Sequence, residues 1–375
     1  MIEFTQTAIQ GETHLNQPDI QTFRHDQSAG TGILLVNLGT PDAPDRASVR
    51  RYLKEFLWDP RVVEVPRPVW WFVLNMVILN TRPGRSAAAY AKVWTEDGSP
   101  LLTISRRQRA ALEARLQERC GSELPVALGM RYGQPSIAGA MAELRDAGVR
   151  RVLVLPLYPQ YSATTVASIF DAVAAEMKQW RWLPELRFIN HYHDDPAYVA
   201  ALADSVRAHR AEHGEADRLL MSFHGIPREY FDKGDPYFCE CQKTGRLLAG
   251  ELGLAEDRWN LTFQSRLGPK DWLRPYTDET LQALPGEGVR SVQVLCPGFS
   301  ADCLETLEEV AMENRDIFLE AGGERYEYIP CLNDDPAHID MLAALAERHL
   351  GGWPLRDEDD RQASLERAKR MGASQ

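Results

Sequence analysis

The chain lacks an apolar run long enough to cross a bilayer. Its most apolar stretch, Val69–Leu79, is about half of the ~20 residues that a spanning helix needs. Two interpretations of this stretch remain open: a buried helix, or an exposed lip that touches lipid or an apolar ligand. Residues 1–30 are polar and lack the basic start and apolar core of a signal peptide, so they predict a disordered tail on a cytoplasmic protein.

Basic residues and cysteines are also scarce. The 42 Lys and Arg residues face 54 Asp and Glu residues, giving a formal net charge of −12, which disfavours nucleic acid as a partner. The six cysteines are scattered through a long chain with no evident secretory signal, which favours reduced thiols in the cytoplasm over a disulfide framework. They are Cys120, Cys239, Cys241, Cys296, Cys303 and Cys331.

Several common catalytic motifs are missing. The chain has no G-x-x-x-x-G-K-[ST], and its early G-T-G precedes a predicted strand instead of following it. G-x-S-x-G and H-E-x-x-H are absent as well. These absences weigh against a P-loop or nicotinamide enzyme, a serine hydrolase and a zincin.

The chain does contain eight short apolar runs that alternate with helical patterns, which is typical of a parallel α/β sheet. The predicted strands are Ile33–Leu38, Val126–Met130, Val152–Pro156, Leu186–His191, Leu219–Phe223, Leu261–Gln264, Val292–Cys296 and Tyr326–Pro330.

The two halves of the chain repeat each other. I-L-L-V-N-L-G-T-P matches L-L-M-S-F-H-G-I-P, and N-H-Y-H-D-D-P matches P-C-L-N-D-D-P. We therefore predict an α/β protein with two similar Rossmann-like lobes, each a four-stranded parallel sheet flanked by helices, with a cleft between them. The predicted lobes span residues 31–193 and 194–350, and residues 351–375 form a charged tail.

The first half also carries an insertion. Matched motifs are 186 positions apart at Leu38 and His224 but 135 apart at Arg131 and Arg266, so 51 extra residues separate the first two strands. The insertion includes Val69–Leu79, and we expect a lip at about residues 66–100. Such a position, past the carboxyl end of a strand, is where α/β sheets bind ligands, which favours the lip interpretation.

His224 and Glu305 are the predicted chemical centre. His224 follows a strand directly and precedes Gly225, and an imidazole can accept a proton near neutral pH or bind a metal. Glu305, Glu309 and Glu313 recur every four residues after the third strand of the second half, so they are expected to share one helical face. Like charges at this spacing destabilise a helix, which points to a path for protons or cations.

Six segments together resemble the ferrochelatases, especially the Gram-negative bacterial type. They are L-L-V-N-L-G-T-P-D-A-P, L-G-M-R-Y-G-Q-P-S, V-L-P-L-Y-P-Q-Y-S-A-T-T, S-F-H-G-I-P, L-T-F-Q-S-R-L-G-P-K-D-W-L-R-P-Y-T-D-E-T and C-P-G-F-S-A-D-C-L-E-T-L-E-E. The resemblance covers about Gly32 to Leu345. It implies insertion of ferrous iron into protoporphyrin IX to give protohaem, the last step of haem biosynthesis.

The resemblance also implies roles for residues. His224 corresponds to the proton acceptor or metal-contacting histidine, and Glu305 to the carboxylate opposite. Glu309 and Glu313 would form the proton or metal path. Val69–Leu79 would form a lip for porphyrin entry that touches the inner membrane peripherally. The residues implied to contact porphyrin are Leu38, Ser99, Arg131, Tyr132, Ser265 and Trp272.

Three related interpretations stay open: coproporphyrin as the macrocycle, cobalt or nickel as the metal, and a non-catalytic porphyrin carrier. The carrier is disfavoured because the His224 and Glu305 pair is intact. An iron–sulfur cluster is not expected, because four thiolates are usually needed and Cys239 and Cys241 have no partner pair in the sequence. No cofactor beyond the substrate iron is predicted, and a monomer is expected.

Overall fold

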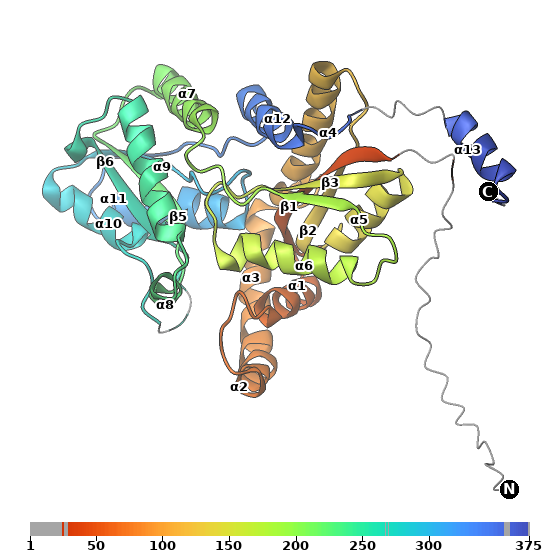
Figure 1. Cartoon of the computed structure of the whole chain (residues 1–375). Helices are drawn as coiled ribbons and strands as arrows, with labels where there is room; N and C mark the ends of the chain where they lie inside the picture. The colour runs from red at the N-terminus through yellow and green to blue at the C-terminus, as the bar shows by residue number, and fades with distance from the viewer. Residues whose placement is uncertain (1–24, 26–28, 267, 269, 356–360, 374–375) are drawn as a thin grey trace, which may run out of the picture.

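The computed structural model describes residue 25, residues 29–266, residue 268, and residues 270–355 and 361–373. The predicted tail, residues 1–30, lies almost wholly outside this range. Two four-stranded parallel sheets lie side by side, each flanked by helices (Figure 1). The predicted fold class is therefore confirmed.

Both sheets have the same strand order. In the first half the order is β2 (Val126–Gly133), β1 (Gly30–Thr40), β3 (Val149–Pro156) and β4 (Glu185–Phe188). In the second half it is β6 (Trp259–Gln264), β5 (Arg218–His224), β7 (Ser291–Leu295) and β8 (Arg325–Tyr328). All eight predicted strands are present, although β4 and β8 stop at Phe188 and Tyr328, before the predicted ends at His191 and Pro330.

The apolar strands are buried on both faces. In β1, Ile33 and Leu35 join one core cluster, whereas Leu34 and Val36 join another on the opposite face of the sheet. This two-residue alternation is what a pleated strand between two helical layers requires. The continuous apolar run I-L-L-V therefore encodes a central strand.

The helices of the first half are α1 (Arg46–Trp58), α2 (Arg67–Phe72), α3 (Leu79–Val93), α4 (Pro100–Cys120), α5 (Ile137–Asp146) and α6 (Ser168–Met177), with π-helices η1 (Val73–Ile78) and η2 (Ala163–Ala167). The second half has α7 (Pro196–His213), α8 (Arg228–Asp232), α9 (Tyr237–Glu251), α10 (Thr277–Ala283), α11 (Asn314–Glu320) and α12 (Pro336–Leu350). It also has 3₁₀-helices η3 (Glu256–Arg258) and η4 (Leu284–Glu287) and π-helix η5 (Glu305–Glu313), and α13 (Arg361–Arg370) follows.

The repeated D-D-P motif starts the same helix in each half. Asp195 caps α7 and Asp335 caps α12, each accepting a hydrogen bond from the amide two residues later. The following proline occupies the first helical turn, where its missing N–H costs nothing. The repeat in the sequence is thus a repeat of helix N-termini.

The predicted insertion forms a projection of α1, α2, η1 and α3, with α2 at its tip (Figure 1). Val69–Leu79 is divided between α2, η1 and the start of α3, and its two faces differ. Trp70, Leu74 and Leu79 are buried in a small core, whereas Val69, Trp71, Phe72, Met76 and Val77 are 49–60% exposed. One face of the segment is therefore buried, as a core helix requires, and the other is exposed; contact of the exposed face with lipid or an apolar ligand stays a prediction.

In the described part of the chain, no helix is long and apolar enough to cross a membrane. Of the predicted tail beyond residue 350, the structure describes residues 351–355 and 361–373. The Trp353 ring lies under the Arg187 guanidinium, 4.1 Å from ring centroid to Cζ, and α13 occupies part of the remaining segment.

Candidate active site

His224 is the last residue of β5 and lies at a sharp turn. The Gly225 amide donates to the Gln264 carbonyl over 2.7 Å, and a Cβ at Gly225 would approach that oxygen to 2.9 Å. Only glycine fits this close approach without a shift. The Trp272 ring packs against the same point, 3.3 Å from the position of that Cβ.

The imidazole of His224 is oriented by its own turn. Nδ1 lies 2.6 Å from the Gly225 carbonyl, so Nδ1 carries the proton in this hydrogen bond. Nε2 is then the nitrogen with the free lone pair. The Phe299 ring lies beside the imidazole, with 6.4 Å between ring centroids. The hydrogen bond to Gly225 therefore fixes the orientation of the imidazole and leaves Nε2 as its unengaged nitrogen.

Residues of both halves meet near Phe299. Leu38, at the end of β1, packs in a cluster with Leu101 from α4 and with Phe299 and Cys303 from the loop after β7. Ser99, in the first half, precedes α4, and its buried hydroxyl accepts a hydrogen bond from the Thr40 hydroxyl over 2.8 Å. Leu38 and His224, which occupy equivalent positions in the repeat, therefore both lie close to Phe299.

Glu305 begins η5 and faces tyrosines of the first half. Burial raises the pKa of Tyr52, Tyr90 and Tyr158, and the nearby Glu305 carboxylate raises each of them further. On the other side, Gln264 Nε2 donates to the Glu305 carbonyl over 3.5 Å. Glu305 therefore lies between the end of β6 and phenols from α1 and α3.

The helix that carries the glutamates differs from the prediction. A four-residue spacing was expected to place Glu305, Glu309 and Glu313 along one α-helical face, but η5 is a π-helix. The spacing does not distinguish hydrogen bonds to i+4 from bonds to i+5, so the sequence could not reveal this. The burial of the three glutamates still decreases along η5: Glu305 and Glu309 are half-buried, and Glu313 is exposed.

Glu309 is joined to Ser265 at the end of β6. The Ser265 amide donates to Oε1 over 2.8 Å and its hydroxyl donates to Oε2. Ser265 has φ 67°, a left-handed conformation that is strained for serine and holds both donors on one carboxylate. Burial and the charges of Glu305 and Glu313 outweigh these hydrogen bonds and raise the pKa of Glu309 to about 7.

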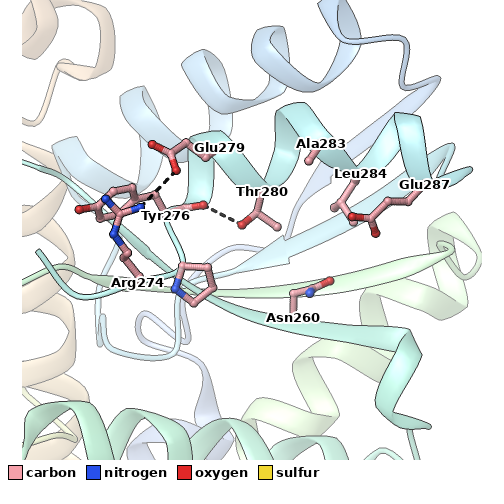
Figure 2. A pocket seen from close by; sticks show the side chains of 9 residues that line it. Asn260, Arg274, Tyr276, Glu279, Thr280, Ala283, Leu284 and Glu287 are labelled. Carbon is pink, nitrogen blue, oxygen red and sulfur yellow. Dashed lines mark hydrogen bonds and ion pairs between the residues drawn. The ribbon is translucent and has the colours of Figure 1, made fainter.

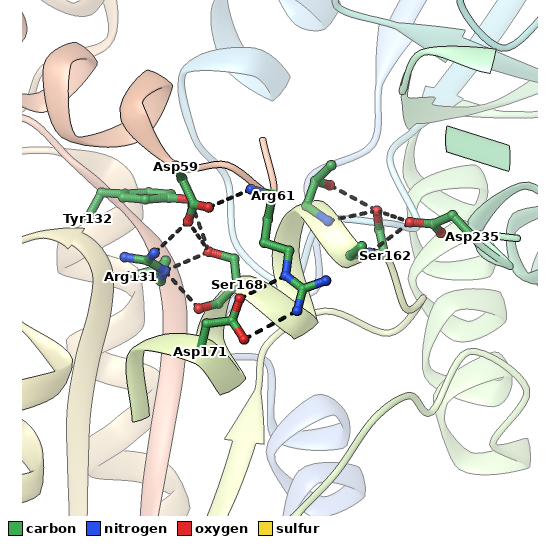
Figure 3. Close-up of polar contacts among 10 residues, drawn as sticks. Asp59, Arg61, Arg131, Tyr132, Ser162, Ser168, Asp171 and Asp235 are labelled. Atoms are coloured by element: carbon green, nitrogen blue, oxygen red, sulfur yellow. Dashed lines mark hydrogen bonds and ion pairs between the residues drawn. The ribbon is translucent and has the colours of Figure 1, made fainter. Parts of the chain in front are cut away.

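Arg131 and Tyr132 lie in a buried network of the first half (Figure 3). Arg131 Nε donates to the Ser168 hydroxyl over 2.6 Å, and the Tyr132 hydroxyl donates to Asp59 Oδ2 over 2.9 Å. Asp59 also pairs with the Arg131 guanidinium. Burial raises the pKa of Asp59, but hydrogen bonds from Ser168, from the Arg61 amide and from Tyr132, together with the Arg131 charge, lower it overall.

The predicted residues thus form two groups. His224, Trp272, Ser265, Glu305 and Glu309 surround the ends of β5 and β6, whereas Arg131 and Tyr132 surround Asp59. Two buried polar atoms near these groups have no hydrogen-bond partner among the residues that the structure describes: the Tyr158 hydroxyl and Trp272 Nε1.

Sequence reasoning missed Asp59, Phe299 and the three tyrosines around Glu305. Asp59 follows α1 in a D-P-R turn with no recognisable signal, and it lies 72 positions from Arg131. The only hint for Phe299 is its place in C-P-G-F-S, immediately after a strand.

A separate pocket lies at the outer edge of the second sheet, between β6 and α10 (Figure 2). It contains none of the predicted site residues. Its lining residues are Asn260, Arg274, Pro275, Tyr276, Glu279, Thr280, Ala283, Leu284 and Glu287.

A sequence model of the family described as Ferrochelatase matches residues 30–350. The chain belongs to the ferrochelatase family. The match spans every predicted site residue, and it confirms the family, the enzyme class and the activity, insertion of iron into protoporphyrin.

Ferrochelatases from Gram-negative bacteria are similar along nearly the whole chain. The protein of Marinobacter nauticus is 55% identical over 90% of this chain and 91% of its own length. That of Thioalkalivibrio sulfidiphilus is 55% identical over 93% and 96%, and that of Nitrosococcus oceani is 52% identical over 96% and 100%.

Among solved structures, the fold is similar to the sirohydrochlorin chelatase SirB from Bacillus subtilis subspecies spizizenii in complex with cobalt. The TM-score is 0.50 at 11% identity, over 86% of this chain and 97% of that one. At this identity the likeness concerns the fold alone.

Proposed function

We propose that His224 and Glu305 catalyse the insertion of iron where the two halves meet, with ferrous iron and protoporphyrin IX as substrates. Four Fe–N bonds form while two pyrrole N–H protons leave, giving protohaem and two protons. The observation that carries the proposal is the hydrogen bond from His224 Nδ1 to Gly225, which leaves Nε2 free to take a proton. An imidazole is a side chain that can take up a proton in this way in general acid–base catalysis.

The macrocycle must bend for its nitrogens to reach the metal. A site that holds the bent form lowers the barrier only if it binds that form better than the flat one. Leu38 and Trp272 offer surfaces to the ring, and Ser99 and Ser265 offer polar edges. The partnerless Trp272 Nε1 and Tyr158 hydroxyl support a ligand in this region, because buried polar groups normally have partners.

Arg131 is proposed to bind a propionate. Its Nε and Nη2 are already engaged by Ser168 and Asp59, so Nη1 is the group left for a carboxylate. Tyr132 is fully buried and positions Asp59, which in turn fixes the guanidinium. This predicted porphyrin contact is therefore proposed to act through Arg131.

Glu305, Glu309 and Glu313 are proposed to carry protons outward or metal inward. Glu309, with its pKa of about 7, can gain and lose a proton near neutral pH. Exposed Glu313 would exchange with solvent. The graded burial along η5 supports a path from the reacting nitrogens to the surface.

The test is an anaerobic assay of haem formation from protoporphyrin IX and ferrous iron. We expect His224→Ala to lower kcat/KM at least 1,000-fold and Glu305→Gln to lower it strongly. His213→Ala, on the exposed surface of α7, is the matched control and should leave the rate unchanged. Substantial activity in His224→Ala would overturn the role given to this residue.

The same assay decides the alternatives. A higher kcat/KM with coproporphyrin, or with cobalt or nickel, would replace the proposed substrates. Tight porphyrin binding with no insertion of any metal would mean a carrier. We expect protoporphyrin IX and ferrous iron to give the highest value.

We further propose that the protein is a cytoplasmic monomer that touches the membrane peripherally through the exposed face of α2 and η1. The half-exposed Trp71, Phe72 and Val77 on one projecting surface support this contact. Soluble monomeric proteins rarely expose several large apolar side chains side by side unless the patch binds a partner or a membrane. A porphyrin is poorly soluble in water, so contact with lipid would bring substrate to the site.

Vesicle flotation tests the contact, with phosphatidylglycerol and phosphatidylethanolamine vesicles. The parent should float with the vesicles, and Phe72→Glu/Val77→Glu should remain in the soluble fraction with an unchanged Tm. Leu183→Glu, at an equally exposed apolar residue away from the projection, is the control and should float. Equal flotation of all three would refute the contact.

A further inference from the structure

Two histidines and a glutamate from different halves meet away from η5. His191 and His193 lie in the segment between β4 and α7, and Glu240 lies in the first turn of α9. The three offer one ligand atom each, and these atoms all lie within 4.8 Å of one another. None of these residues has a role in the proposed reaction.

The geometry places one imidazole at each oxygen of the carboxylate. His191 Nδ1 lies 2.8 Å from Oε1, and His193 Nδ1 lies 3.2 Å from Oε2. The two rings are 5.0 Å apart between centroids and tilted by 46°, so their nitrogens converge on the glutamate. His193 and Glu240 are only 4% and 8% exposed, whereas His191 faces solvent.

The Glu240 carboxylate is held in place, but one imidazole nitrogen of the cluster lacks a hydrogen bond. The Tyr161 amide donates to Glu240 Oε2 over 2.7 Å, which fixes the carboxylate. Within the described part of the chain, buried His193 Nδ1 makes no hydrogen bond, although it lies 3.2 Å from Oε2. A buried nitrogen without a partner is costly, and native proteins usually provide one.

An ion pair alone would leave this nitrogen unsatisfied. His191 Nδ1 is within hydrogen-bond geometry of Oε1, whereas His193 Nδ1 lies 3.2 Å from Oε2 without that geometry, so the ion pair does not satisfy it. A cation between the three groups would instead accept lone pairs from both imidazoles and from the carboxylate. The nitrogen donors exclude Mg²⁺ and Ca²⁺, which prefer oxygen ligands.

We propose that His191, His193 and Glu240 bind a divalent transition-metal ion of the Zn²⁺ class, with an open position toward solvent on the His191 side. Two histidines and one glutamate are a familiar ligand set for such ions. The ion would fasten α9 of the second half to the segment that leads from β4 into α7. Its role is structural, and the assignment does not depend on the proposed mechanism.

The experiment uses the full chain with His224→Ala, which removes the imidazole proposed to meet iron. The metal-free protein is titrated with Co²⁺ and with Zn²⁺ by calorimetry, and Co²⁺ binding is followed by visible absorption. We expect one equivalent, a spectrum of nitrogen and oxygen ligands without thiolate charge transfer, and a rise in Tm with Zn²⁺.

Two variants locate the site. His191→Ala, at an exposed position that does not threaten folding, should weaken binding at least tenfold, and His191→Ala/His193→Ala should abolish it together with the rise in Tm. His209→Ala/His213→Ala is the matched control, because these two rings also lie together, 4.4 Å apart and near Glu327, and it should bind normally. Absence of a binding equivalent, unchanged affinity in the double variant, or equal loss in the control would overturn the proposal.

Discussion

The pKa values of two carboxyl groups in the candidate site shift in opposite directions because their hydrogen-bond partners differ. Asp59 is surrounded by donors and by the Arg131 charge, so its pKa falls despite burial. Glu309 has only the two donors of Ser265 and lies near two other carboxylates, so its pKa rises to about 7. Burial acts on both alike, and the neighbours decide the sign.

Glu309 should make stability fall as the pH rises. Its pKa is about 7 in the folded protein and 4.5 ordinarily, so the unfolded state releases its proton first between these values. The stabilisation is therefore fully present below about pH 4.5 and lost as the pH rises through 7. Glu309→Gln should raise the free energy of unfolding at pH 8 by about 1 to 3 kcal/mol and change it little at pH 5. Urea denaturation at the two pH values measures this.

Asp59→Asn is the control, because its expected sign is opposite. The pKa of Asp59 is lowered, so its stabilisation is present above the ordinary value of 3.8 and lost as the pH falls through the folded value. Asp59→Asn should therefore destabilise at pH 8 and progressively less below about pH 4. An equal effect of Glu309→Gln at pH 5 and pH 8 would contradict the raised pKa.

At the scale of elements, the strands could be predicted well because burial on both faces demands continuous apolar runs. The repeat also predicted two similar four-stranded lobes, and the structure adds that they share one strand order and that α7 and α12 start alike. It could not predict η5, since the glutamate spacing fits two helix types. Nor could it predict the His191 cluster, because the second half has Cys331 and Asn333 at the matching positions, and Asn333 instead donates to Asp302.

The helix caps give a prediction at this scale. Asp335→Ala should cost about 1 kcal/mol through the lost cap of α12. Asp195→Ala removes the equivalent cap of α7 and also an ion pair with Arg348 of α12, so it should cost about 0.5 kcal/mol more. Urea denaturation of the two variants measures the difference.

Arg348→Ala completes a double-mutant cycle. In that background the costs of Asp195→Ala and Asp335→Ala should converge, because only the caps then remain. Equal costs in the parent chain would show that the ion pair contributes nothing.

At the scale of the molecule, the two halves are joined more closely than a pair of repeated lobes requires. One core cluster includes Leu35 of the first sheet, Met221 of the second, and residues of α4, α7 and α12. The α12 helix, last in the second half, lies beside α4 and α7 (Figure 1). Buried Gln108 of α4 also donates to the carbonyls of Ser300 and Asn333, over 2.9 and 2.8 Å.

This shared core predicts that the halves unfold together, as one cooperative transition. Val154 on β3 and Val294 on β7 occupy equivalent positions in the repeat, and each is fully buried in a core cluster of its own half. Val154 pairs with Phe188 on β4, as Val294 pairs with Tyr328 on β8. Val154→Ala and Val294→Ala should each cost about 2 kcal/mol and lower the Tm of the same single calorimetric transition. If the halves were independent domains, each variant would split the transition, because only the half that lost the methyl groups would melt early.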